Sequence, residues 1–203
     1  MSFPTIKICG MKEAQKIKLS IDFGAKLIGF IVNYKPSPRY INFDQLKDLT
    51  KTIPSHIKKV GVMVNPTLDE VKKLDEYCDT IQLHGDETNE FIETIKKETK
   101  LEVIKAIKMK DQKDLDKMNN FKNADYLLLD TPAMGQGGEE FNFDLLKNIK
   151  HKNFFLAGKI NIDNVKTALQ YTDKIDVNSS LESEKGIKDP IKIKLFFEKI
   201  KSL

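Results

Sequence analysis

Eight short apolar runs recur along this chain, separated by longer amphipathic stretches, and this alternation is the feature that most restricts its fold. Each run has the length typical of a strand rather than of a helix. Strands that alternate with helical stretches are typical of βαβ units, which place their strands in a parallel sheet. The runs cover residues 5–9, 27–32, 59–64, 80–83, 101–107, 125–129, 153–157 and 174–177.

The stretches between the runs carry helical signals. Val71, Leu74 and Cys78 repeat with helical spacing after a start signal at residues 65–70, and residues 163–169 and 190–200 show the same pattern. Eight βα units in 203 residues predict an α/β protein with one domain, a (β/α)8 TIM barrel over residues 1–203. A doubly wound open sheet is the alternative, but it usually has fewer strands and a glycine-rich phosphate turn that this chain lacks.

Composition excludes several classes of function. The net charge of +4 comes from lysines spread along the chain, without a basic block interleaved with aromatics, so we expect no nucleic-acid partner. No apolar run approaches the ~20 residues of a membrane helix, and the first residues lack the pattern of a signal peptide. The two cysteines are far apart and are expected to be reduced, which predicts the cytoplasm. Metal-ligand spacing is absent, so we expect no metal.

Polar residues follow the predicted strands at the end where a barrel carries its chemistry. Cys9 and Asp130 each directly cap an apolar strand, and a thiol and a carboxyl group in such places are candidates for a base and an acid. The alternative for Cys9 is a purely structural role as a small core residue. The other polar groups after the strands are Arg39, Asn65, His84, Lys159, Ser179 and Ser180.

Arg39 is the only arginine among 34 basic residues. A guanidinium grips a carboxylate or phosphate with two parallel hydrogen bonds, whereas an ammonium is a point charge. Pro36 and Pro38 stiffen the loop that presents this side chain. We therefore interpret Arg39 as an anion-binding residue, with a surface salt bridge as the alternative.

The two-residue period of a strand predicts what lies beneath Cys9. Lys7 shares its face, while Ile6 and Ile8 face the helices. In a closed barrel the eighth strand neighbours the first, which allows Asp176 to pair with Lys7. We expect the Lys7 cation to favour the Cys9 thiolate. The alternative is an interior ion pair with a structural role alone.

Several motifs together resemble the phosphoribosylanthranilate isomerase family of tryptophan biosynthesis. The most specific are KICG at residues 7–10, SPRY at 37–40 and QLHGD at 82–86. The motifs also occur in the family's order along the chain. The others are VGVMVN at 60–65, LLLD at 127–130, LAG at 156–158, IDV at 175–177 and GIKDP at 186–190. The resemblance thus extends over nearly the whole chain.

The resemblance implies an Amadori rearrangement of N-(5-phosphoribosyl)anthranilate, without metal or cofactor, in a monomer or homodimer. It implies Asp130 as general acid and Cys9 as general base, with Arg39 on the anthranilate carboxylate. It also implies a phosphate site at the ends of strands seven and eight, where backbone N–H groups bind the anion. The substrate-binding residues expected around this pair are Lys7, Arg39, His84, Gly158, Lys159, Asp176, Ser179 and Ser180.

The chain departs from the family pattern in three places, and two other functions remain open. Lys159 stands where a second glycine is usual, Ser180 stands where the family has the glycine of Ser-Ser-Gly, and Glu139 replaces a residue that is often basic. One alternative is a different sugar-phosphate enzyme on the same barrel, although its usual metal ligands or lysine and glutamate pair are missing. The other is a barrel that binds its ligand without turnover.

Overall fold

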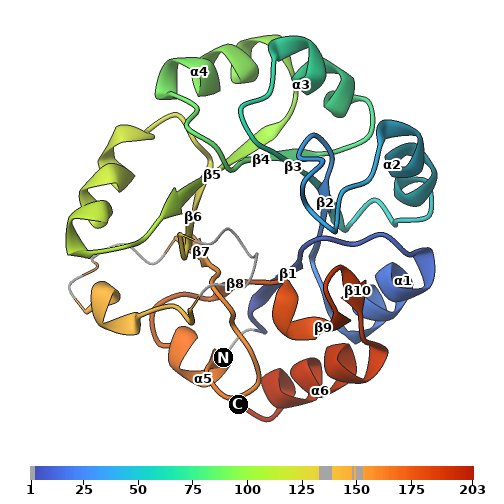
Figure 1. Ribbon diagram of the computed structural model, residues 1–203, viewed down its shortest axis with the longest axis vertical. Coiled ribbons are helices and arrows are strands. Elements are labelled where there is room, and N and C mark those ends of the chain that lie inside the picture. The colour runs from blue at the N-terminus through green and yellow to red at the C-terminus, as the bar shows by residue number, and fades with distance from the viewer. Residues whose placement is uncertain (1–2, 133–138, 148, 150–152) are drawn as a thin grey trace.

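The protein folds into a closed barrel of eight parallel strands, surrounded by helices (Figure 1). This computed structural model describes residues 3–132, 139–147, 149 and 153–203. The predicted (β/α)8 barrel is confirmed, and the open doubly wound sheet is wrong because β8 pairs with β1. Residues 135–138 of the loop after β6 lie outside the described part of the chain.

The strands lie close to where the sequence places them, with no end shifted by more than one residue. They are β1 (Thr5–Ile8), β2 (Leu27–Ile31), β3 (Lys58–Met63), β4 (Thr80–Leu83), β5 (Glu102–Lys108), β6 (Tyr126–Asp130), β7 (Phe154–Leu156) and β8 (Lys174–Val177). Most of their residues are buried, because a parallel barrel covers both faces of each strand. This explains why the strands read as continuous apolar runs.

Four of the α-helices, α2, α3, α4 and α6, begin at side chains that satisfy their first free N–H groups. Thr67 caps α3 in a reciprocal box with Glu70, and Asp189 caps α6, where Pro190 occupies the first turn. The expected helices at 163–169 and 190–200 are confirmed as α5 and α6, the former shorter than predicted. The α-helices are α1 (Ala14–Phe23), α2 (Phe43–Thr50), α3 (Leu68–Asp75), α4 (Asn89–Glu98), α5 (Val165–Ala168) and α6 (Pro190–Lys201).

In the described part of the chain, three 3-10 helices and a hairpin complete the fold. η1 (Gln112–Asn120) and η2 (Phe143–Leu146) take the places of α-helices after β5 and β6. η3 (Ser179–Leu181) follows β8 and leads into an antiparallel hairpin of β9 (Glu182–Glu184) and β10 (Ile187–Lys188). This hairpin lies beside β1 and α6 in Figure 1, on the side of the barrel that carries the loop after β1.

The core has two layers. Ile6 and Ile8 pack in the outer layer between the strands and the helices, as the period of β1 predicts. The barrel interior is a smaller cluster that includes Leu27, Ile104 and Phe155. Among the described residues, no helix is both long and apolar enough to cross a bilayer.

Candidate active site

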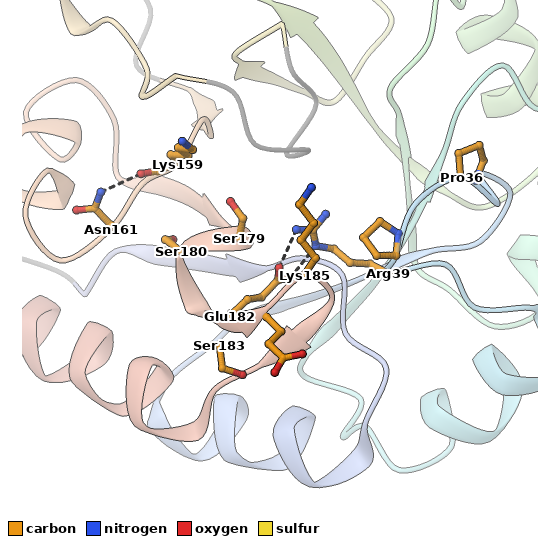
Figure 2. Close-up of a pocket in the computed structure, with 11 residues that line it drawn as sticks. Pro36, Arg39, Lys159, Asn161, Ser179, Ser180, Glu182, Ser183 and Lys185 are labelled. Carbon is orange, nitrogen blue, oxygen red and sulfur yellow. Dashed lines mark hydrogen bonds and ion pairs between the residues drawn. The ribbon is translucent and has the colours of Figure 1, made fainter.

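Two cavities that share Lys159 and Ser179 lie around the carboxyl ends of the strands. The inner cavity, of about 50 Å3, is lined by Cys9, His84, Asp130, Gly158 and Asp176 together with the shared pair. The outer cavity, of about 550 Å3, adds Arg39 and Ser180 (Figure 2). The fold thus brings the predicted site residues to one mouth of the barrel, with Lys7 next to Asp176.

Cys9 directly follows β1, and only 5% of its surface is exposed. Burial raises the pKa of its thiol, while Lys7 and Lys188 lower it without reversing the shift. Lys7 thus favours the thiolate, as predicted, but the net shift of the Cys9 pKa is upward. The reason is that desolvation of the thiolate outweighs the attraction of the ammonium.

Lys7 and Asp176 form the predicted pair inside the barrel. They are register partners in β1 and β8, and Lys7 Nζ donates to Asp176 Oδ2 at 2.9 Å. Burial opposes the Lys7 charge, but Asp176 and Cys9 outweigh it and raise the pKa of Lys7. The pair joins the strand that carries the candidate base to the strand that leads into η3.

Lys7→Met is expected to lower the free energy of unfolding by about 3–5 kcal/mol, because it leaves the Asp176 carboxylate buried without its partner. Urea unfolding followed by circular dichroism measures this loss. The double variant Lys7→Met with Asp176→Asn removes both charges and should recover most of it. Equal stability of the single and double variants would contradict a paired interior charge.

Asp130 ends β6 and faces His84 across the inner cavity. Its Oδ1 accepts a hydrogen bond from Thr131 N at 2.8 Å, and its Oδ2 lies 3.4 Å from His84 Nε2. The other ring nitrogen of His84 contacts the Gln82 amide at 3.0 Å. His84 therefore lines the cavity beside the candidate acid, and Gln82 fixes the ring orientation.

Arg39 is buried, with 2% of its surface exposed, so the alternative of a surface salt bridge is wrong. Its Nε and Nη2 each donate to a carboxylate oxygen of Glu182 at 2.7 Å, which is the fork-to-fork geometry of arginine. The third nitrogen of the guanidinium, Nη1, does not contact Glu182, and Arg39 lines the outer cavity (Figure 2). Glu182 thus fixes one edge of the guanidinium.

Gly10 lets the Arg39 stem pass over the loop after β1. A Cβ at this position would lie 2.5 Å from Arg39 Cδ and 3.0 Å from Asn178 Oδ1, and its φ of +72° is left-handed. An alanine therefore displaces Arg39 and strains the backbone.

Gly10→Ala is expected to raise KM for a carboxylated substrate by about tenfold to a hundredfold, the size of effect that a small misplacement of a binding group produces. Steady-state kinetics measures this change. Gly24→Ala is the matched control, since Gly24 also has a positive φ but packs against Phe3. The same rise in KM for both variants would show a general effect of strain and would contradict the role of Gly10.

The phosphate site is predicted at the ends of β7 and β8, where two residues have unusual backbone angles. Gly158 and Lys159 both have positive φ, of +93° and +54°, which explains the usual preference for glycine at the second position. Lys159 adopts this strained backbone conformation and lines both cavities. Ser180 Oγ donates to the Ile160 carbonyl oxygen, which ties η3 to the loop after β7.

Sequence reasoning missed the partners of Arg39. Glu182 starts β9, and Lys188 in β10 donates to Glu182 Oε1 at 2.7 Å and to Asn178 Oδ1 at 2.7 Å. The available signal was the lone arginine, because a buried guanidinium needs a carboxylate. Nothing in the sequence pattern told which of the many acidic residues supplies it.

Two absences complete the description of the site. Within the residues that the structure describes, no three His, Cys, Asp or Glu side chains are grouped to hold a metal ion. Both cysteines are free and buried.

The closed barrel and the cavities at its carboxyl end place the chain in the class of (β/α)8-barrel enzymes. The family model described as N-(5'phosphoribosyl)anthranilate (PRA) isomerase matches residues 6–199, and the chain belongs to this family.

Known proteins are similar over nearly the full chain. A protein named N-(5'-phosphoribosyl)anthranilate isomerase from Listeria innocua is 38% identical, covering 98% of each chain. The crystal structure of phosphoribosyl anthranilate isomerase from Thermotoga maritima has a TM-score of 0.88 at 28% identity, covering 98% of this chain and 100% of that one. Another structure of such an enzyme, with reduced 1-(o-carboxyphenylamino)-1-deoxyribulose 5-phosphate, has a TM-score of 0.84 at 28% identity and the same coverage.

Proposed function

We infer that this protein converts N-(5-phosphoribosyl)anthranilate into 1-(2-carboxyphenylamino)-1-deoxyribulose 5-phosphate in tryptophan biosynthesis. The observation that carries this inference is the placement of Cys9 and Asp130 on one small cavity at the barrel mouth. The reaction needs one proton given to oxygen and another taken from carbon. A carboxyl group and a thiol on the same cavity supply this combination.

Ring opening is assigned to Asp130. Its carboxylic acid gives a proton to the furanose ring oxygen as the bond from that oxygen to C1 breaks. The lone pair of the anthranilate nitrogen forms the C1–N double bond of a protonated Schiff base. Asp130 is left as a carboxylate, 3.4 Å from His84 Nε2, which can donate a hydrogen bond to it.

Isomerisation is assigned to Cys9. Its thiolate takes the proton from C2, the C2–H electrons form the C1–C2 double bond, and the iminium electrons return to nitrogen. The enolamine becomes the ketone as the Asp130 carboxylate takes the proton of the 2-hydroxyl and the Cys9 thiol gives one to C1, which restores both groups. Because burial raises the pKa of Cys9, this step depends on Lys7 and on the positive charge of the iminium to stabilise the thiolate.

The two cavities together offer groups for both anionic ends of this substrate. Arg39 receives the anthranilate carboxylate, and the backbone N–H groups around Gly158, Lys159, Ser179 and Ser180 receive the phosphate. Lys7, His84 and Asp176 surround the reacting carbons and their acid and base. The reaction as written needs neither metal nor cofactor, and we expect the protein to work in the cytoplasm as a monomer or homodimer.

The test is the loss of anthranilate fluorescence when the purified chain is mixed with freshly generated phosphoribosylanthranilate in excess chelator. We expect loss much faster than the spontaneous decay in buffer. Decay at the buffer rate would refute the isomerase function. Such a result would favour a different sugar phosphate or a barrel that binds without turnover.

A further inference from the structure

We propose that Lys188 is a positioning residue that keeps the positive charge of Arg39 available for the carboxylate of the ligand. This inference rests on the proposed function, since it concerns how the anthranilate carboxylate is bound. Lys188 acts through Glu182, the carboxylate that lies between the two cations, and it does not contact the ligand. It therefore determines affinity for the anionic aromatic end of the substrate.

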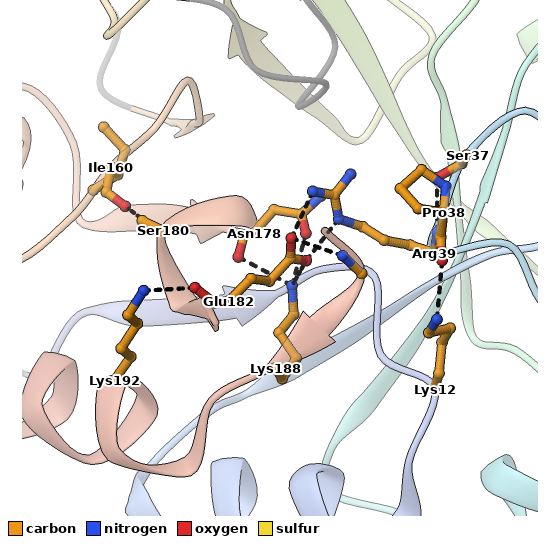
Figure 3. A network of polar contacts seen from close by, with 11 residues as sticks. Lys12, Ser37, Pro38, Arg39, Ile160, Asn178, Ser180, Glu182, Lys188 and Lys192 are labelled. Carbon is orange, nitrogen blue, oxygen red and sulfur yellow. Dashed lines mark hydrogen bonds and ion pairs between the residues drawn. The ribbon is translucent and has the colours of Figure 1, made fainter. Parts of the chain in front are cut away.

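The geometry of the cluster assigns every hydrogen of the Lys188 ammonium. Lys188 Nζ lies 2.7 Å from Glu182 Oε1, 2.7 Å from Asn178 Oδ1 and 3.0 Å from Asn178 O (Figure 3). An ammonium has three donors, so these three acceptors use all of them. Lys188 is also only 3% exposed. It has no donor left for a ligand.

Glu182 is saturated in the same way. Its Oε1 accepts from Arg39 Nε and Lys188 Nζ, and its Oε2 accepts from Arg39 Nη2 and from Gly186 N at 3.1 Å. Burial alone would raise the pKa of this carboxyl group, but the bonds and charges of Arg39 and Lys188 lower it to about 2. Glu182 is therefore a full negative charge at neutral pH.

The charge of the cluster follows from these contacts. Arg39 and Lys188 contribute two positive charges and Glu182 one negative charge, so the buried group has a net charge of +1. With Lys188 removed, Arg39 and Glu182 form a neutral pair. A neutral pair attracts a carboxylate far less than a net cation does in a partly desolvated site.

The net positive charge of the cluster faces the outer cavity through one nitrogen of Arg39. In the described part of the chain, Arg39 Nη1 makes no hydrogen bond, and Arg39 lines the outer cavity. Lys188 and Glu182 approach the guanidinium from its other edge (Figure 3). Arg39 thus contacts the ligand carboxylate, while Lys188 balances the negative charge of Glu182 on the side away from the ligand.

A purely structural role does not explain this arrangement well. Burial lowers the pKa of Lys188, which means that its ammonium is held in place against a desolvation cost. Buried ion groups of this kind are often replaced by apolar side chains without loss of stability. A function that needs the charge accounts for a lysine here.

The test compares Lys188→Met with the double variant Glu182→Gln and Lys188→Met. The single variant makes the cluster neutral, whereas the double variant restores a net charge of +1 through Arg39 alone. We expect Lys188→Met to raise KM by about tenfold to a hundredfold, the size seen when one of two desolvated charges is removed, with kcat changed less than about threefold. The double variant should return KM to within about threefold of the wild type.

Binding of two probes separates charge from packing. The probes are reduced 1-(o-carboxyphenylamino)-1-deoxyribulose 5-phosphate and the same compound without its carboxylate, measured by calorimetry. Lys188→Met should weaken the first and leave the second unchanged, and the surface variant Lys194→Met should alter neither. An unchanged affinity for the carboxylated probe, an equal loss for both probes, or a double variant as weak as the single one would overturn the proposal.

The outcomes also separate this proposal from the proposed function. A wild type that does not turn over phosphoribosylanthranilate but binds the carboxylated probe refutes the function alone, and the binding comparison still decides the role of Lys188. A wild type that turns over normally while Lys188→Met leaves KM unchanged refutes the role of Lys188 alone. If Lys188→Met does not fold, a folded double variant with weak binding of the carboxylated probe refutes it as well.

Discussion

Asp130→Asn is expected to lower kcat by about a hundredfold to ten-thousandfold, the usual contribution of a positioned acid. The amide has the same shape, so it can still accept the hydrogen bond from Thr131 N and lie beside His84. What it loses is the proton that ring opening requires. Stopped-flow fluorescence with phosphoribosylanthranilate measures the loss, while binding of the carboxylated product analogue should change little.

The control for this variant is Asp144→Asn. Asp144 lies in η2 and is paired with Lys147 at the surface, away from both cavities. The Asp144→Asn substitution makes the same chemical change, aspartate to asparagine, without altering the site. Turnover by Asp130→Asn within about tenfold of the wild type would contradict its assignment as the acid.

Cys9→Ser is expected to cause a loss of similar size, about a hundredfold to ten-thousandfold in kcat, because a hydroxyl group is a far poorer source of an anionic base than a thiol. The kcat/KM of the wild type should depend on pH through the ionisation of this thiol. Burial raises the pKa of Cys9, so the limb of the kcat/KM profile that reports this thiol should lie at pH values above the ordinary range of a thiol. Stopped-flow rates across a series of buffers measure this dependence.

Cys78→Ser is the matched control, because Cys78 is also a free and buried cysteine whose pKa is raised by burial. It packs in the outer layer of the core, so its replacement should lower stability more than turnover. Retention of full activity by Cys9→Ser, or equal losses for the two cysteines, would contradict the assignment of the base.

The parts of the fold that were predictable are those fixed by short-range pattern. The strands are buried on both faces, so each appears as an apolar run whose ends are marked by polar residues. The pairing of Lys7 with Asp176 also followed, because the period of a strand and the closure of a barrel together determine which side chains meet.

The parts that were not predictable depend on distance along the chain or on the balance of opposing energies. Glu182 lies 143 residues from Arg39, and nothing local marks it as the partner. The β9–β10 hairpin has short strands with exposed residues, so it lacks the apolar signal of the barrel strands. The pKa of Cys9 depends on whether burial or the Lys7 charge is stronger, and a pattern of residue types contains no information on that balance.

The Lys7–Asp176 contact has a consequence for synthesis of the chain. Its two residues are 169 positions apart, so the contact forms only after nearly the whole polypeptide has left the ribosome. Until β8 docks, β1 has a free edge, Lys7 has no counterion, and the surroundings of Cys9 are incomplete. Nascent chains that end before β8 should therefore be inactive even where their earlier βα units have folded. Closure of the barrel and assembly of the reactive thiol are the same event.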